Sequence, residues 1–159
     1  MSSNGISELH ENVIDQVLDL NGSPEVILQA TCDLLHDTMP NWSWVGIYFL
    51  QGDHLILGPY QGPETEHEKI KVGEGVCGTA IKENKNMIVN DVSTIENYIA
   101  CAPNTKSEIV VLIRYQDQVV GQFDVDSDNA ANFSEQDEKL LLEVADLVGP
   151  YCRVLSAKA

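Results

Sequence analysis

Two pairs of adjacent strand-like segments constrain the fold of this chain more than any other feature. Residues 44–50 are rich in aromatic and β-branched side chains, and a tight turn at 51–53 leads into a second strand over 54–60. Residues 109–114 and 118–125 repeat the arrangement through another short turn. Strands joined by such short turns pair antiparallel, because a parallel neighbour needs a long crossover connection. The sequence therefore predicts an antiparallel sheet.

Two helical patterns precede the strands. Apolar residues recur at helical spacing over 6–20 and again from Ser23 to about Met39. Ser23 is suited to be an N-cap, and Pro24 follows it at a position where a helix tolerates proline. We expect the second helix to bury Ile27, Ala30 and Leu34, with Cys32 or Leu35 beside them.

A final helix is predicted from Ser134, an N-cap with Asp137 in the capping-box position, to about Leu155. Helices at both ends of a run of hairpin-linked strands indicate an α+β fold, a central antiparallel sheet with the helices on one face. The last helix should bury Leu140, Leu141, Val144, Leu147 and Val148. The middle of the chain should hold a mobile polar loop (61–69), short strands (70–72 and 87–90), a helix (75–83) and a short helix or turn (93–100).

Length and charge limit the function classes. The chain has 159 residues without a repeat or a long linker, so we expect a single domain over residues 1–159. Its formal net charge of −16 repels phosphate groups, which makes nucleic acids and anionic membranes poor partners. We find neither an apolar run of membrane-spanning length nor a signal peptide, and we therefore expect a cytoplasmic protein.

The four cysteines and four histidines lack the spacing of a zinc site, so no metal is expected. Thiols in a reducing compartment are normally free. Cys32 and Cys152 lie within apolar helical patterns and are interpreted as core residues. Cys77 and Cys101 lie at predicted loop or helix-edge positions, where functional groups concentrate. For each of these two, an inert buried thiol is the alternative.

Residues 73–78 match the pattern G-x-G-x-x-G and precede a predicted helix. A dinucleotide site also needs a parallel strand–helix–strand unit, which an antiparallel sheet does not supply. The glycines are therefore better interpreted as a tight turn followed by a helix N-terminus. A thiol at such a terminus, here Cys77, gains reactivity.

Three carboxylates stand in or beside apolar strands. Glu108 would be a proton donor near neutral pH if it is buried beside an apolar pocket; an exposed strand-end glutamate is the alternative. Asp124 and Asp126 share one face of their strand, because strand side chains alternate. This like-charged pair favours a bound ammonium group over calcium, since EF-hand spacing is missing, and a solvated acidic edge is the alternative.

Trp44 and Tyr48 are four residues apart in a strand and therefore share a face. Core packing is the default interpretation, and an aromatic wall for an apolar ligand group is the alternative. His67 lies in the polar loop among three glutamates and is interpreted as a solvated side chain.

Taken together, these residues resemble the free methionine-(R)-sulfoxide reductases, a family built on the GAF fold. The resemblance covers residues 23–150 approximately, in family order and with matching spacing. A GAF fold alone says little about function, whereas this combination of segments is specific. The matching segments are 41–48, 57–62, 75–80, 99–101, 107–111 and 124–127.

The resemblance implies a role for each candidate residue. Cys101 would be the nucleophile that attacks the sulfoxide sulfur, and Glu108 would be the protonated acid that assists loss of the oxygen. Asp124 and Asp126 would hold the amino group of the free amino acid. Main-chain amides near Cys101 would receive the carboxylate. A substrate that must offer both groups is a free amino acid and not a protein side chain.

The resemblance also implies a reaction cycle and its partners. Trp44 and Tyr48 would wall the methyl side of the pocket. Attack would leave Cys101 as a sulfenic acid, which condenses with a nearby thiol to a disulfide. A thioredoxin-like reductant would restore the thiols, so no bound cofactor is needed. The resemblance also implies a homodimer, because isolated GAF domains of this kind are often dimeric.

One position departs from the family pattern. Many members carry another cysteine ten residues before the one in Gly-Val-Cys-Gly, and this position is His67 here. Cys77 is then the remaining candidate for the resolving thiol, which requires its α-carbon to approach that of Cys101 within roughly 7 Å. Two other functions stay open: a non-catalytic GAF sensor that binds a small ligand, and a redox switch based on a Cys77–Cys101 disulfide.

Overall fold

The computed structural model describes residues 3–96, 98–99 and 103–158. Six strands form one sheet in the order β3-β2-β1-β6-β5-β4, and every neighbouring pair is antiparallel. The predicted α+β architecture with a central antiparallel sheet is confirmed. The elements are α1 (Ser3–Leu18), α2 (Pro24–Thr38), β1 (Trp44–Gln51), β2 (His54–Gln61), β3 (Lys69–Lys71), α3 (Gly75–Glu83), β4 (Met87–Val89), the 3₁₀ turn η1 (Val92–Thr94), β5 (Ser107–Tyr115), β6 (Gln118–Ser127) and α4 (Glu135–Lys158).

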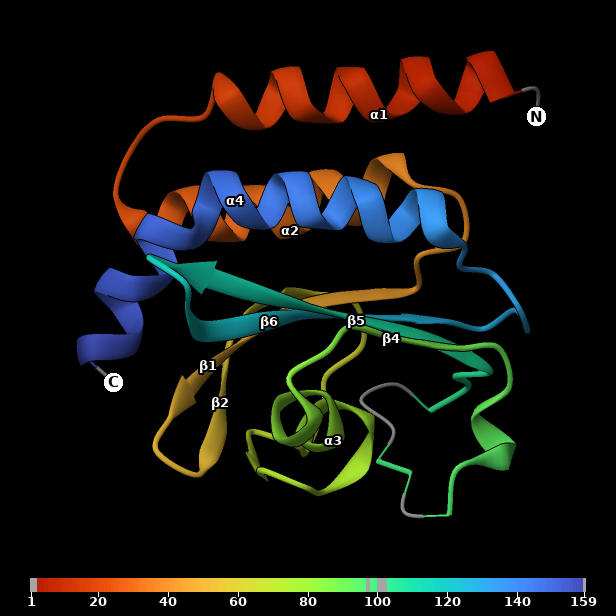
Figure 1. The fold of residues 1–159 in the computed structure, drawn as a ribbon. Helices are drawn as coiled ribbons and strands as arrows, with labels where there is room; N and C mark the ends of the chain where they lie inside the picture. Colours follow the sequence, from red (N-terminus) through yellow and green to blue (C-terminus); the bar gives the residue numbers. More distant parts are fainter. Residues whose placement is uncertain (1–2, 97, 100–102, 159) are drawn as a thin grey trace.

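The helices lie on both faces of the sheet, which corrects the expectation of helices on one face. Helices α2 and α4 cover one face, and α1 packs outside them (Figure 1). Helix α3 lies against the opposite face (Figure 1), and Val92, Ile95 and Ile99 pack in the same apolar cluster as this helix. The reason is the strong apolar character of both strand faces: β1 and β5 each begin with six or more consecutive buried residues. A sheet that is apolar on both faces must be covered on both.

The alternation of side chains along the strands separates two apolar clusters. The cluster under α2 and α4 contains Val45, Ile47 and Phe49 of β1. The cluster under α3 contains Trp44 and Tyr48 of the same strand. The predicted shared face of Trp44 and Tyr48 is therefore confirmed, and it is the face away from the long helices.

The ends of the long helices follow the predicted chemistry. The Ser23 side chain accepts a hydrogen bond from the Val26 amide at the start of α2, and the Ser134 amide donates to Asp137 Oδ2 at 3.0 Å at the start of α4. The inward stripe of α2 agrees with the prediction in part: Ile27, Cys32 and Leu35 are buried as expected, together with Leu28 and Thr31. Leu28 was not predicted, and Ala30, Leu34 and Leu147 are only partly buried. The stripe is shifted because residues 28, 32 and 35 share one helical face.

The predicted loop over 61–69 is shorter than expected. Gln61 ends β2 and Lys69 begins β3, so residues 62–68 connect two strands that pair with each other. Side-chain hydrogen bonds attach the carbonyl groups of Pro63 and His67 to the sheet. None of the helices that the structure describes is both long enough and apolar enough to cross a membrane.

Cys32 and Cys152 are buried in the cluster under the long helices, as predicted. Burial, with smaller contributions from Cys152 and Asp33, raises the pKa of the Cys32 thiol well above its usual value, and burial raises the pKa of Cys152 to about 12. We therefore expect both thiols to resist a disulfide-exchange reagent at pH 8 in native protein. Labelling a variant that lacks Cys77 and Cys101 checks this. Both thiols should react rapidly only after denaturation, and fast native labelling would contradict the assignment.

Candidate active site

The sheet face under α3 carries a row of buried polar side chains. Asp126 of β6 stands directly between Trp44 of β1 and Glu108 of β5 in the strand register. Asp124, two residues earlier on β6, lies on the same face. All four side chains are at most 1% exposed. The predicted shared face of the two aspartates is confirmed, and the alternatives of an exposed Glu108 and a solvated acidic edge are wrong.

Glu108 and Asp126 lie directly opposite each other in the strand register, and both are buried. Burial and the neighbouring Asp124 raise the pKa of Asp126 well above the ordinary aspartate range, while interactions with Glu108 and Thr105 act in the opposite direction. The raised pKa favours the protonated form of Asp126, beside Glu108, in the folded protein.

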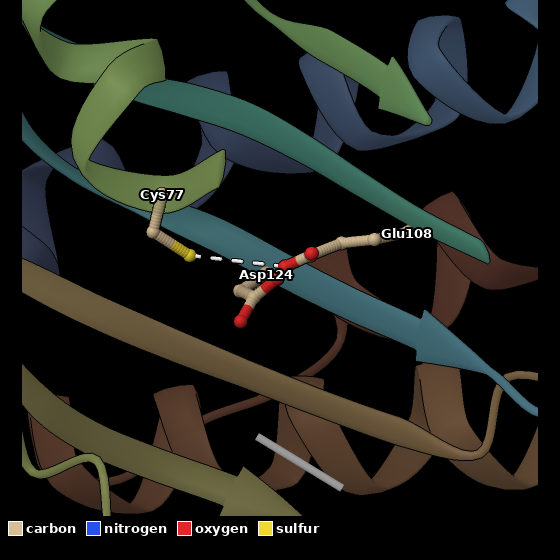
Figure 2. Close-up of side chains that lie close together, drawn as sticks. All are labelled: Cys77, Glu108 and Asp124. Atoms are coloured by element: carbon tan, nitrogen blue, oxygen red, sulfur yellow. Dashed lines mark hydrogen bonds between the residues drawn. The ribbon is translucent and has the colours of Figure 1, made fainter. Parts of the chain in front are cut away.

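Cys77 contacts this acidic row from helix α3, which covers this face of the sheet. It lies in the first turn of α3, which confirms its predicted position at a helix N-terminus, and it is only 4% exposed. Its Sγ donates to Glu108 Oε2 at 3.9 Å, and Sγ and one oxygen each of Glu108 and Asp124 all lie within 4.8 Å of one another (Figure 2). A thiol and two carboxyl groups from three different elements thus meet in one place.

The close approach of α3 to the sheet depends on Gly78. A β-carbon at this position would lie 2.5 Å from the carbonyl oxygen of Lys71, a distance that side chains do not tolerate. Gln122 of β6 also connects α3 to the sheet, because its Nε2 donates to the Cys77 carbonyl at 3.3 Å. Gln122 was not predicted as a site residue. Its signal was available, since it precedes Asp124 by two positions on the same strand face.

Aromatic rings form one wall of this region. Trp44 stacks on Tyr60 with ring centroids 5.3 Å apart, and its centroid lies 6.4 Å from that of Tyr48. Trp44 Nε1 donates to the Pro63 carbonyl at 3.0 Å, and the Tyr48 hydroxyl donates to the His67 carbonyl at 2.8 Å. The two interpretations of these rings, core packing and an aromatic wall for a ligand, are therefore compatible. The rings pack in an apolar cluster, and they lie beside the acidic row on the same face of the sheet. Tyr60 is a third member that the sequence did not reveal.

Tyr98 and Thr105 border the acidic row and were also missed. Burial, followed by the charges of Glu108, Asp126 and Asp124, raises the pKa of the Tyr98 phenol strongly. Thr105 interacts with both Tyr98 and Asp126. A cavity of about 550 Å³ opens beside Tyr98 and Thr105. Neither residue lies in a regular element, so strand or helix periodicity gave no signal for them.

Cys101 lies outside the described residues, and its predicted position is not tested. Its neighbour Ile99 is described and packs on the start of α3. A β-carbon on Gly75 would lie 3.1–3.2 Å from the Ile99 side chain, which shows how closely the two residues approach. Gly75 itself has φ +63°, a conformation that glycine adopts at little cost. The segment that leads to Cys101 therefore contacts the turn that leads to Cys77.

This sheet and these helices define a GAF domain, and the model of the GAF domain family matches residues 21–150. The free methionine-R-sulfoxide reductase of Escherichia coli (strain K12) is 37% identical over 117 residues, covering 74% of this chain and 70% of the relative. The chain belongs to the free methionine-(R)-sulfoxide reductase family of GAF domain proteins.

Solved structures agree with this assignment. The type II free methionine-R-sulfoxide reductase of Thermoplasma acidophilum superposes with a TM-score of 0.77 at 37% identity, covering 92% of this chain and 96% of that one. The Staphylococcus aureus protein named fRMsr, solved in complex with substrate, gives a TM-score of 0.80 at 33% identity over 92% and 95% of the two chains.

Proposed function

We propose that this protein reduces free methionine-(R)-sulfoxide to methionine, with Cys101 as the nucleophile. The observation that carries the proposal is the buried row of Glu108, Asp124 and Asp126 opposite an aromatic wall. The relatives named free methionine-R-sulfoxide reductase support the substrate.

The substrate has one charged group that suits the aspartates and one apolar group that suits the rings. The ammonium group of the amino acid binds at Asp124 and Asp126, where a cation relieves the repulsion between two buried carboxylates. The methyl group lies against Trp44 and Tyr48. Peptide-bound methionine sulfoxide has no free ammonium group, so it lacks the group that the acidic row selects.

Glu108 supplies the proton that the reaction needs. Sulfoxide oxygen is a poor leaving group until it is protonated or hydrogen-bonded. Glu108 is 1% exposed and lies opposite Asp126, whose pKa is raised. Burial favours the neutral form of a carboxyl group. The buried carboxyl pair is therefore the proposed source of the proton that passes to the sulfoxide oxygen.

The proposed cycle balances in two steps. The Cys101 thiol attacks the sulfoxide sulfur, the oxygen passes to the cysteine as a sulfenic acid, and methionine leaves; sulfur of the substrate gains two electrons and Cys101 loses two. The Cys77 thiol then attacks the sulfenic sulfur, a disulfide forms and water leaves. A thioredoxin-like dithiol outside the protein reduces this disulfide, so the protein needs no bound cofactor.

The contact between Ile99 and Gly75 supports Cys77 as the resolving thiol. Ile99 precedes Cys101 by two residues, and Gly75 precedes Cys77 by two residues. Two residues of extended chain span at most roughly 7 Å, so each cysteine lies no further than that from this contact. The proposal is that a short rearrangement brings the two thiols together, although His67 replaces the family cysteine.

Turnover with matched substrates tests the proposal. Free L-methionine-(R)-sulfoxide, its S epimer and a peptide-bound sulfoxide are offered with thioredoxin and its reductase, and then with dithiothreitol. We expect turnover of the free R epimer alone, abolished in Cys101→Ser and retained in Cys152→Ala. Cys77→Ser should lose thioredoxin-dependent turnover more than dithiothreitol-dependent turnover.

The negative outcomes discriminate between the remaining functions. Binding of the sulfoxide without turnover under either reductant would favour a ligand sensor. A reversible Cys77–Cys101 disulfide without turnover would favour a redox switch. Equal turnover of the peptide-bound sulfoxide would contradict the role of the aspartates.

A further inference from the structure

The meeting point of Cys77, Glu108 and Asp124 has the composition of a zinc site. The three ligand atoms lie within 4.8 Å of one another, and the side chains come from α3, β5 and β6 (Figure 2). The three residues are all buried, at 4%, 1% and 0% exposure. Zinc binds both thiolate and carboxylate ligands, and three protein ligands with one open position are typical of zinc sites that admit a further ligand.

The distances between the ligand atoms suit tetrahedral coordination of an ion if these atoms move slightly closer together. Zinc lies at about 2.3 Å from sulfur and about 2.0–2.2 Å from carboxylate oxygen. Two such ligands at a tetrahedral angle are therefore roughly 3.5 Å apart. The separation of Cys77 Sγ from Glu108 Oε2 is 3.9 Å, so a shift of a few tenths of an ångström closes this edge of the site.

A second observation points to a ligand at this place. Gln122 is fully buried, and its Oε1 has no hydrogen-bond partner within the part of the chain that the structure describes. The amide is held at the cluster because its Nε2 donates to the Cys77 carbonyl. A buried acceptor without a partner is costly. An ion at the cluster, or a water molecule bound to that ion, would satisfy the Gln122 oxygen.

The surrounding charge also favours a cation. Asp126 lies two residues from Asp124 on the same sheet face and directly opposite Glu108 in the strand register. Three buried carboxyl groups therefore lie together at this place, and a cation is the charge that suits them. The thiol selects among divalent cations, since Mg²⁺ and Ca²⁺ take oxygen ligands, whereas Zn²⁺ binds sulfur readily.

We propose that Cys77, Glu108 and Asp124 bind Zn²⁺ and that the bound ion inhibits the enzyme by occupying the substrate pocket. Sequence spacing gives no sign of such a site, because the ligands come from three elements and Cys77 is 31 residues from Glu108. The inhibitory part rests on the proposed reductase function, and the binding part does not.

The inhibition follows from proton and charge balance. Zinc binds the thiolate and the carboxylates, so binding releases the thiol proton and any proton that the carboxyl groups hold. Glu108 then has no proton to give to a sulfoxide oxygen. Asp124, engaged by the ion, no longer attracts an ammonium group. Substrate and zinc therefore exclude each other, and a chelator restores the reduced enzyme.

Cobalt and zinc titrations of the reduced full-length chain test the binding. Co²⁺ bound to a thiolate gives a charge-transfer absorption in the near ultraviolet, which Zn²⁺ abolishes by displacement. We expect this band in the unaltered protein and in Cys101→Ser, and its absence in Cys77→Ser. Zinc affinity in Cys77→Ser and in Asp124→Asn should fall by more than the roughly 10- to 100-fold that loss of an outer-shell partner causes. Mg²⁺ in excess should not compete.

The outcomes test the choice of zinc ligands and the reductase function separately. A cobalt–thiolate band lost in Cys101→Ser but kept in Cys77→Ser would overturn the assignment, as would unchanged zinc affinity in both Cys77→Ser and Asp124→Asn. Circular dichroism shows that each variant is folded. Competitive, chelator-reversible inhibition of sulfoxide turnover supports the regulatory part; turnover that is insensitive to saturating zinc contradicts it. Protein that binds zinc at Cys77 but lacks turnover contradicts the reductase function alone.

Discussion

Replacing Glu108 by glutamine is expected to lower kcat for free methionine-(R)-sulfoxide by roughly 10²- to 10⁴-fold, the usual contribution of general acid catalysis. The amide of glutamine has nearly the same shape and can still donate a hydrogen bond to the sulfoxide oxygen. It cannot transfer a proton to that oxygen. The loss should therefore appear in kcat, with a smaller change in KM, because Glu108 acts on the leaving oxygen and the aspartates hold the substrate.

The matched control for this variant is Glu83→Gln. Glu83 is a half-exposed residue at the end of α3 that forms an exposed ion pair with Lys85, and its change is the same carboxyl-to-amide replacement. Steady-state kinetics of both variants, with unfolding curves to confirm the fold, are sufficient. A Glu108→Gln enzyme with nearly unchanged kcat would show that the proton comes from another group.

Replacing Asp126 by asparagine is expected to change binding and stability in opposite directions. KM for the free sulfoxide should rise at least about 30-fold, which corresponds to about 2 kcal/mol, the lower limit for loss of one partner in a buried charge pair. The thermal stability at neutral pH should increase, because the folded protein keeps Asp126 protonated at a free-energy cost that asparagine does not carry.

The pH dependence of the free energy of unfolding tests whether the raised pKa of Asp126 causes this change in stability. The pKa of Asp126 is raised in the folded protein, so between the ordinary aspartate pKa and this raised pKa the folded state binds more protons than the unfolded state. The free energy of unfolding therefore falls as pH rises through this interval, and stays reduced above it. In Asp126→Asn this fall should be smaller.

Asp128→Asn serves as the control, since Asp128 is two residues further along and exposed. It should leave KM nearly unchanged and should alter the pH dependence of unfolding far less than Asp126→Asn, because Asp128 is the smallest contribution to the raised pKa of Asp126. An Asp126→Asn variant that loses stability at neutral pH, or that keeps the KM of the unaltered protein, would contradict the account.

The order of the elements and the faces of the strands could be predicted because they depend on local pattern. Ser23 and Ser134 marked helix starts, and alternation along the strands placed Asp124 with Asp126 and Trp44 with Tyr48. The position of α3 could not be predicted, because it depends on contacts such as that of Gly78 with the Lys71 carbonyl. No local pattern reports which face of a sheet a short helix will cover.

The contacts within the site also join residues that are far apart in the sequence. Burial of Glu108 follows from its register with Asp126 and from the α3 thiol above it, and these residues come from separate elements. Tyr98 and Thr105 lie in irregular backbone, where periodicity says nothing. The chemistry of single residues was thus visible in the sequence, whereas the meeting of Cys77 with Glu108 and Asp124 required the fold.

The two hydrogen bonds that fasten residues 62–68 to the sheet also bear on the configuration of the sulfoxide sulfur in the proposed reaction. Trp44 has one N–H group and Tyr48 has one O–H group, and both are donated to loop carbonyls. In the proposed pocket, the rings therefore have no N–H or O–H donor left for a ligand. A sulfoxide oxygen turned toward them would lose its hydrogen bonds to water without replacement, at about 1–3 kcal/mol. An oxygen turned toward Glu108 would keep a donor, so we expect the aromatic wall to favour one configuration of the sulfur over the other.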